Sequence, residues 1–160
     1  MHGEPALSTR MQGFRTAERE RRALIQPSTQ LSPVSVVVVE DDDGLRPEIV
    51  EYLRRRRRRV TACASLAEAR KALEKALNDG NPPHAVICDV GLPDGNGLDF
   101  YMAFARQLPA SHWILMSGSH DIHRLKEQLG KLTGLRPPLI VEKPVPLKAL
   151  SLLIDEASAH

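Results

Sequence analysis

Five short apolar runs, all downstream of residue 33, alternate with segments whose apolar residues recur at helical spacing. The runs begin at Val34, Val60, Ala85, Trp113 and Leu139. Short runs rich in β-branched residues are typical of buried strands. Because strands that alternate with helices form parallel sheets covered on both faces, the chain is predicted to be an α/β domain with five strands and five helices.

The segments between the runs are predicted to be amphipathic helices. Ser65 followed by Glu68 forms a capping-box pattern at the start of the second helix. The third helix is expected to end at Pro109, and Gly130 weakens the fourth. The apolar positions that define the five helices are Leu45, Ile49, Tyr52 and Leu53; Leu66, Ala69, Leu73, Ala76 and Leu77; Leu98, Tyr101, Met102, Ala105 and Leu108; Ile122, Leu125, Leu129 and Leu132; and Leu147, Leu150, Leu153 and Ile154.

Residues 1–33 are predicted to be a flexible, disordered extension, and residues 34–160 the folded domain. Gly, Pro, Ser, Thr and Gln are frequent in the extension, and its apolar residues have no sustained period. The segment 16–25 could form a short charged helix, but it is too short to be stable alone. A partner-binding or dimer-capping role for this helix remains the alternative.

Charge and composition exclude several functional classes. From Val34 onward, 17 basic residues balance 17 acidic ones, so net charge gives no indication of a nucleic-acid partner. No apolar run approaches the roughly 20 residues of a membrane span, and the N-terminus has no signal-peptide pattern. Cys63 and Cys88 lie in apolar runs without the spacing of a metal site. They are expected to be buried thiols in the reducing cytoplasm.

Six consecutive arginines, Arg54–Arg59, follow the first predicted helix. Cations suit a helix C-terminus, but six in succession surround the helix, so one or two must lie along apolar surface. No Gly is present to adopt the left-handed cap conformation, so another residue must adopt it. The run is interpreted as a solvated helix end. An acidic partner or non-specific nucleic acid is the alternative, weakened by the lack of interleaved aromatic residues.

Polar side chains stand where four of the predicted strands end. Glu40 and Asp41 follow the first strand, Asp89 ends the third, Ser117 the fourth and Lys143 the fifth. The carboxyl ends of parallel strands meet at one edge of a sheet, so these groups can converge. Crowded carboxylates need a cation, and all-oxygen ligation suits Mg²⁺. A carboxylate can attack phosphorus, while a Lys and a hydroxyl hold phosphoryl oxygens.

Four motifs in this order, VVVVEDD, ICDVGLPDGNG, ILMSG and VEKP, resemble those of the receiver domain of two-component response regulators. The resemblance covers about residues 34–157. It implies the flavodoxin-like doubly wound sheet with strand order 2-1-3-4-5.

The resemblance also implies a metal site and a phosphorylation site. Asp89 would be the phospho-acceptor and a metal ligand. Asp41 would bind Mg²⁺ directly, Glu40 would hold it through water, and the carbonyl of Gly91 would be a further ligand. Two more roles follow from the resemblance: Ser117 would be the switch hydroxyl, and Lys143, in a cis bond to Pro144, would pair with the phosphoryl group.

The reaction implied is phosphoryl transfer from a phosphohistidine, on a histidine kinase or phosphotransfer protein, to Asp89. Such a domain is a signalling phosphoacceptor that catalyses only its own phosphorylation and dephosphorylation. Phosphorylation would shift the population toward a state with altered protein contacts near the fourth helix, fifth strand and fifth helix. Homodimerisation on that face stays open. No output domain follows in the sequence, so the chain alone is not expected to bind DNA specifically.

Two positions depart from the usual pattern of these receivers. Ile140 stands where an aromatic residue is common, and Val145 where Phe is common. The rival hypothesis is therefore a phosphorylation-independent adaptor with the same fold. An FMN protein is disfavoured by the acidic loop after the first strand, and a P-loop enzyme by the lack of GxxxxGK. A phosphatase with an Asp nucleophile would need a second acid where Gly91 stands.

Overall fold

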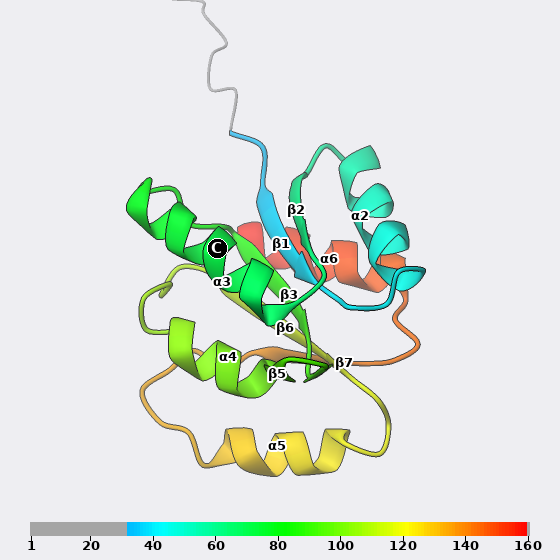
Figure 1. Ribbon diagram of the computed structural model, residues 1–160, viewed down its shortest axis with the longest axis vertical. Coiled ribbons are helices and arrows are strands. Elements are labelled where there is room, and N and C mark those ends of the chain that lie inside the picture. The colour runs from blue at the N-terminus through cyan, green and yellow to red at the C-terminus, as the bar shows by residue number, and fades with distance from the viewer. Residues whose placement is uncertain (1–31, 160) are drawn as a thin grey trace, which may run out of the picture. The chain divides into compact units, whose positions relative to one another are not determined.

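The computed structural model describes residues 32–159, and all structural statements below concern that part of the chain. Its central sheet has five parallel strands in the order β2-β1-β3-β6-β7 (Figure 1). Counted along the chain, this is the predicted order 2-1-3-4-5. The strands are β1 Ser35–Val39, β2 Arg59–Cys63, β3 Ala85–Asp89, β6 His112–Ser117 and β7 Leu139–Glu142. Except for residues 32 and 33, the predicted extension lies outside the described residues.

Five helices cover the two faces of the sheet, as predicted. They are α2 Leu45–Arg55, α3 Leu66–Asn78, α4 Gly97–Phe104, α5 Ile122–Gly130 and α6 Leu147–Ser158. Helices α2 and α6 share one apolar layer with the sheet, and α3, α4 and α5 share the other (Figure 1). The alternation of strands and helices in the sequence therefore produces a three-layer domain.

Strand β1, which lies between β2 and β3, shows how the two layers arise. Successive side chains of a strand point to opposite faces. Val36 and Val38 are buried with Ile49 and Leu53 of α2, whereas Val37 and Val39 belong to the layer on the other face. A strand buried on both faces must be apolar at every position, and this explains its run of valines.

Helix α3 begins at the predicted cap. The Ser65 hydroxyl accepts a hydrogen bond from the Glu68 N–H at 3.2 Å. The Glu68 carboxylate accepts in return from the N–H of Ala64 at 2.7 Å, one residue earlier than a standard capping box. The start of this helix could thus be predicted, although the detail of the returning bond could not.

Helix α4 is shorter than predicted. It ends at Phe104, and the buried residues Ala105 and Leu108 lie in the turn that follows. The Leu108 N–H still bonds to the Phe104 carbonyl at 3.0 Å, so the turn keeps the helical spacing of its apolar residues. Likewise α5 ends at Gly130, before Leu132. Periodicity marks which residues are buried, and a turn can bury them as a helix does.

The arginine run forms the junction between α2 and β2. Arg57 has φ 60°, so it takes the left-handed conformation that no Gly is present to adopt. Arg58 is the buried member, with 8% of its surface exposed. The expectation that a non-glycine residue adopts the left-handed conformation is confirmed. One arginine of the run is withdrawn from solvent, and the contacts of its guanidinium with α6 are polar.

Both cysteines are buried free thiols, as predicted. Burial raises the pKa of Cys63 to about 11, and burial also raises the pKa of Cys88. Neither thiol is therefore activated as a nucleophile.

A short hairpin that was not predicted follows Asp89. Strand β4 Gly91–Leu92 pairs antiparallel with β5 Gly95–Asn96. Strands of two residues are too short to show the alternation of apolar and polar residues by which a strand is recognised in a sequence. In the described part of the chain, no helix is long and apolar enough to cross a membrane.

Candidate phosphoryl and metal site

The acidic run after β1 divides into residues that build the loop and residues that face the site. The Asp42 carboxylate accepts hydrogen bonds from the N–H groups of Gly44 and Leu45, both at 2.8 Å. These bonds start helix α2 and lower the pKa of Asp42. Asp43 pairs with Arg46 at 2.6 Å. Glu40 and Asp41 are the members of the run whose carboxylates lie near Asp89.

Asp89 ends the buried strand β3, and its side chain is held by the loop that follows. Its Oδ1 accepts a hydrogen bond from the Gly91 N–H at 3.2 Å. The start of α4 lies directly against its backbone: a Cβ on Gly97 would lie 2.2 Å from the Asp89 carbonyl oxygen. Only glycine permits this approach without a shift of the backbone.

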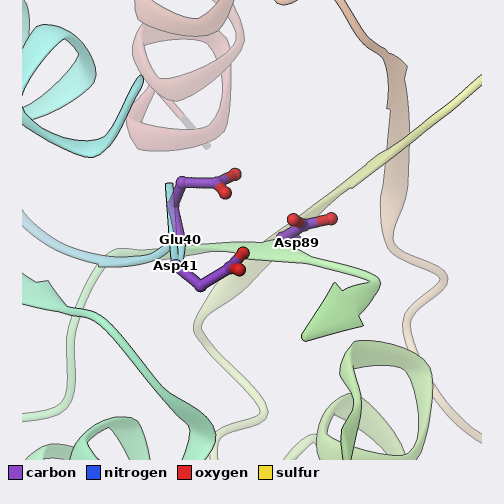
Figure 2. Close-up of side chains that lie close together, drawn as sticks. All are labelled: Glu40, Asp41 and Asp89. Carbon is purple, nitrogen blue, oxygen red and sulfur yellow. The ribbon is translucent and has the colours of Figure 1, made fainter. Parts of the chain in front are cut away.

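Three carboxylates converge at the carboxyl edge of the sheet. Glu40, Asp41 and Asp89 each offer an oxygen, and these oxygens all lie within 4.8 Å of one another (Figure 2). Glu40 and Asp89 are buried, with 1% and 7% of their surfaces exposed, and Asp41 is exposed. Two carboxylates of the cluster are therefore enclosed, and the third, Asp41, opens the cluster to solvent.

Lys143 bridges the two buried carboxylates. Its Nζ donates to Glu40 Oε2 at 2.9 Å and to Asp89 Oδ2 at 2.8 Å. Burial raises the pKa of Glu40, and the hydrogen bond from Lys143 opposes this only in part. Burial acts to lower the pKa of Lys143, but the hydrogen bonds to Asp89 and Glu40 outweigh it, so the pKa is raised. The ammonium therefore stays charged at neutral pH.

The donor set fits a divalent metal ion. One ammonium faces three carboxylates, which leaves an excess of negative charge in a small volume. Arg46 donates to the Glu40 carbonyl at 2.9 Å and pairs with the Asp43 carboxylate, so its charge is directed to Asp43 and not to the cluster. Carboxylate oxygens with one open side are the ligands that Mg²⁺ prefers.

The remaining predicted site residues lie at the same edge. Ser117 ends β6 and is buried, and its hydroxyl donates to the Gly118 carbonyl at 3.3 Å. Its own carbonyl accepts from the Lys143 N–H at 2.8 Å, which ties the ends of β6 and β7 together. Within residues 32–159, the Ser117 hydroxyl makes no hydrogen bond to the carboxylates. The Lys143–Pro144 bond is cis, as expected.

Two residues that support the site were missed in the sequence. Arg46 holds the carbonyl of Glu40 and the side chain of Asp43. A cation in the first turn opposes the helix dipole, and that unfavourable placement is a signal that could have found it. Gly97 gave no such signal, because its need for glycine arises from contact with Asp89 rather than from its neighbours in sequence.

The family described as the response regulator receiver domain matches residues 36–154. This range contains the whole sheet except for the first residue of β1, and every residue of the acidic cluster. The chain therefore belongs to the receiver domain family of response regulators. Receivers are signalling modules rather than classical enzymes. A comparison with curated proteins finds no match.

Solved structures show the same fold at low sequence identity. A receiver domain protein from Clostridium thermocellum is 21% identical, with a TM-score of 0.65 over 78% of this chain and 93% of that one. The non-phosphorylated HemR receiver domain from Leptospira biflexa is 24% identical, with a TM-score of 0.61 over 79% and 94%. The BeF3-activated DrrB receiver domain is 22% identical, with a TM-score of 0.60 over 81% and 100%.

Proposed function

We propose that this domain is a phosphoacceptor in a two-component system. A histidine kinase or phosphotransfer protein donates the phosphoryl group, and Asp89 accepts it. The observation that carries the proposal is the contact between Lys143 and the Asp89 carboxylate, beside two further carboxylates. The Asp89 oxygen would be the nucleophile, and the Lys143 ammonium could pair with a phosphoryl oxygen once the group is transferred. The three carboxylates beside them would hold Mg²⁺.

Each residue has a distinct part. Glu40, Asp41, Asp89 and the carbonyl of Gly91 would hold Mg²⁺. When bound, the ion supplies positive charge that offsets the charge on the transferring phosphoryl group. The Gly91 N–H and the Lys143 ammonium orient the two oxygens of Asp89. In the phosphorylated state, Lys143 pairs with one phosphoryl oxygen. The Ser117 hydroxyl turns away from the Gly118 carbonyl and donates to a second phosphoryl oxygen.

The reaction balances as a simple displacement. An oxygen of Asp89 forms a bond to phosphorus, and the bond between phosphorus and the donor histidine nitrogen breaks. That nitrogen keeps the electron pair of the broken bond, and the histidine ring takes up one proton from solvent to become a neutral imidazole. Hydrolysis of the acyl phosphate later returns Asp89 to a carboxylate and releases inorganic phosphate. Both a non-phosphorylated receiver and a BeF3-activated one are named among the similar structures.

Acetyl phosphate with Mg²⁺ tests the proposal, with intact mass as the readout. The expected result is a gain of one phosphoryl group by the wild type and none by Asp89→Asn. Asp99→Asn is the matched control, because Asp99 is an exposed carboxylate in the first turn of α4. Labelling of Asp89→Asn at the wild-type level would overturn the assignment.

The adaptor hypothesis makes the opposite prediction. Ile140 is half-buried and packs against the apolar layer of α3, α4 and α5. Because isoleucine has no aromatic ring, the inward turn of a ring at this position is not available to the domain, and this departure motivates the adaptor hypothesis. A phosphorylation-independent adaptor would show no mass increase with acetyl phosphate or with a phosphohistidine donor. The intact set of Lys143, Glu40 and Asp89 contacts favours the phosphoacceptor, since an adaptor has no need of it.

A further inference from the structure

A basic groove lies between the end of α2 and the outer side of α6. It encloses about 450 Å³. Five cationic side chains and one carboxylate line it, together with two apolar residues and a serine. The lining includes Arg57, Arg58, Lys148, Ser151, Leu152 and Asp155. The proposed phosphorylation chemistry uses none of the lining residues. The α2 end of the groove lies where β2 begins, at the edge of the sheet opposite to Asp89.

Arg58 fixes the shape of this groove. Its guanidinium donates to the Ser151 hydroxyl at 3.2 Å and to the Ser151 carbonyl at 3.3 Å, and it pairs with Asp155. Its Nε is buried without a hydrogen-bond partner among the described residues. The bonds tie the arginine run to α6, and the left-handed Arg57 turns the chain immediately before it. The arginines that remain exposed therefore project from a fixed turn.

The exposed cations of the groove are only partly neutralised. Arg55 pairs with Glu51, and Arg56 lies over the Tyr52 ring with its guanidinium carbon 3.5 Å from the ring centroid. Arg57 and Lys148 have no ion-pair partner within residues 32–159. The one carboxylate of the groove, Asp155, is taken by Arg58. Two exposed cations that lack an ion-pair partner among the described residues can pair with an anionic ligand.

The chemistry of the groove favours an acidic protein segment over a nucleic acid. Leu152 is 53% exposed, and it offers an aliphatic contact. The single aromatic ring among the lining residues, Tyr52, is covered on one face by Arg56, so that face is not free for a base to stack on. The chain's own residues 1–33 are a poor occupant, since they carry five arginines and three acidic residues.

We propose that the groove between α2 and α6 binds an acidic segment of a partner protein, one that combines carboxylates with aliphatic side chains. The carboxylates pair with Arg57 and Lys148, and an aliphatic side chain packs on Leu152. This interaction does not depend on the phosphoryl site. It gives the domain a second contact surface, lined by none of the residues of the acidic cluster.

Fluorescence anisotropy with the full chain tests the proposal. The probe is a fluorescein-labelled peptide of alternating glutamate and leucine, and a glutamine–leucine peptide is its uncharged counterpart. The double variant Arg57→Gln/Lys148→Gln is expected to weaken binding of the acidic peptide roughly fivefold, as for the loss of two exposed charge pairs. Binding should also weaken as salt increases.

The matched control is Arg124→Gln/Lys126→Gln, which removes the same charges from exposed positions on α5. This control should bind the acidic peptide as the wild type does. Both double variants should keep the circular dichroism spectrum and the urea midpoint of the wild type, which shows that they fold. Equal weakening by both double variants would reduce the effect to net charge and overturn the proposal. So would tighter binding of a single-stranded oligonucleotide than of the acidic peptide, or equal binding of the glutamine–leucine peptide.

Discussion

The Lys143 ammonium lies between two buried carboxylates, 103 and 54 positions away in sequence. Its place could be predicted, because the topology of a parallel sheet brings strand ends together whatever their separation along the chain. Its direct contact with Glu40 could not be predicted. That contact depends on the conformations of the two side chains, and strand order alone does not define these conformations.

We expect Lys143→Ala to keep Mg²⁺ binding and to lose phosphorylation efficiency. Removing a donor aimed at the charge that develops in the transition state costs on the order of 100-fold in rate. The carboxylates that would hold the ion are unchanged. Mg²⁺ titration and the rate of acetyl phosphate labelling measure the two effects separately. Labelling at the wild-type rate would remove Lys143 from the site.

Gly97 is predicted to be the least replaceable glycine near the site. A methyl group there would lie 2.2 Å from the Asp89 carbonyl oxygen, so Gly97→Ala forces the start of α4 away from β3. We expect a loss of about 1–3 kcal/mol in the free energy of unfolding, as for other overpacked sites. Urea denaturation measures it.

Gly130→Ala is the control for this substitution, since a Cβ at Gly130 meets nothing within 4 Å. The control should change stability by less than about 1 kcal/mol, because Ala suits a helix end at least as well as Gly. An unchanged urea midpoint in Gly97→Ala would show that the contact with Asp89 relaxes freely.

The Asp94 side chain joins helix α3 to the loop after Asp89. The Asp94 carboxylate accepts hydrogen bonds from the N–H groups of Leu66 at 3.1 Å and of Ala67 at 3.0 Å. These bonds lower the pKa of Asp94. The Ser65 cap of the same helix was predictable from neighbouring residues, but Asp94 was not, because it lies 28 positions from Leu66.

The stabilisation by Asp94 should depend on pH in a defined direction. A carboxyl group whose pKa is lowered on folding stabilises the native state above its unfolded pKa of about 3.9, and this contribution is lost as the pH falls through the folded value. We expect Asp94→Asn to be less stable than the wild type at neutral pH. The difference should shrink below about pH 4. Thermal unfolding across this range measures it, and a constant difference would contradict the assignment.

Across the whole domain, prediction of the fold from the sequence succeeded where neighbouring residues carry the signal for a strand or a helix. The β-branched run of β1, the cap of α3 and the strand order that the family motifs implied all agree with the structure. The prediction was wrong or made no statement where the structure depends on distant contacts. The early end of α4, the β4–β5 hairpin and the burial of Arg58 in place of its neighbours are decided by packing against other elements.

The boundary of the folded unit is a proposal that a truncation tests. We expect removal of residues 1–33 to change the free energy of unfolding by less than about 0.5 kcal/mol, because the composition of this segment is unsuited to a packed core. Urea denaturation of the full chain and of residues 34–160 measures the difference. A large loss of stability on truncation would show that the segment belongs to the core.

The central claim is that a phosphoryl group resides on Asp89. Borohydride reduces an acyl phosphate to an alcohol, so treatment after labelling with acetyl phosphate and Mg²⁺ marks the acceptor covalently for peptide mass mapping. We predict a single reduced carboxyl group, at Asp89, that requires both the donor and Mg²⁺. A reduced carboxyl elsewhere, or none in a preparation shown to bind Mg²⁺ and exposed to both acetyl phosphate and a phosphohistidine donor, would contradict the claim.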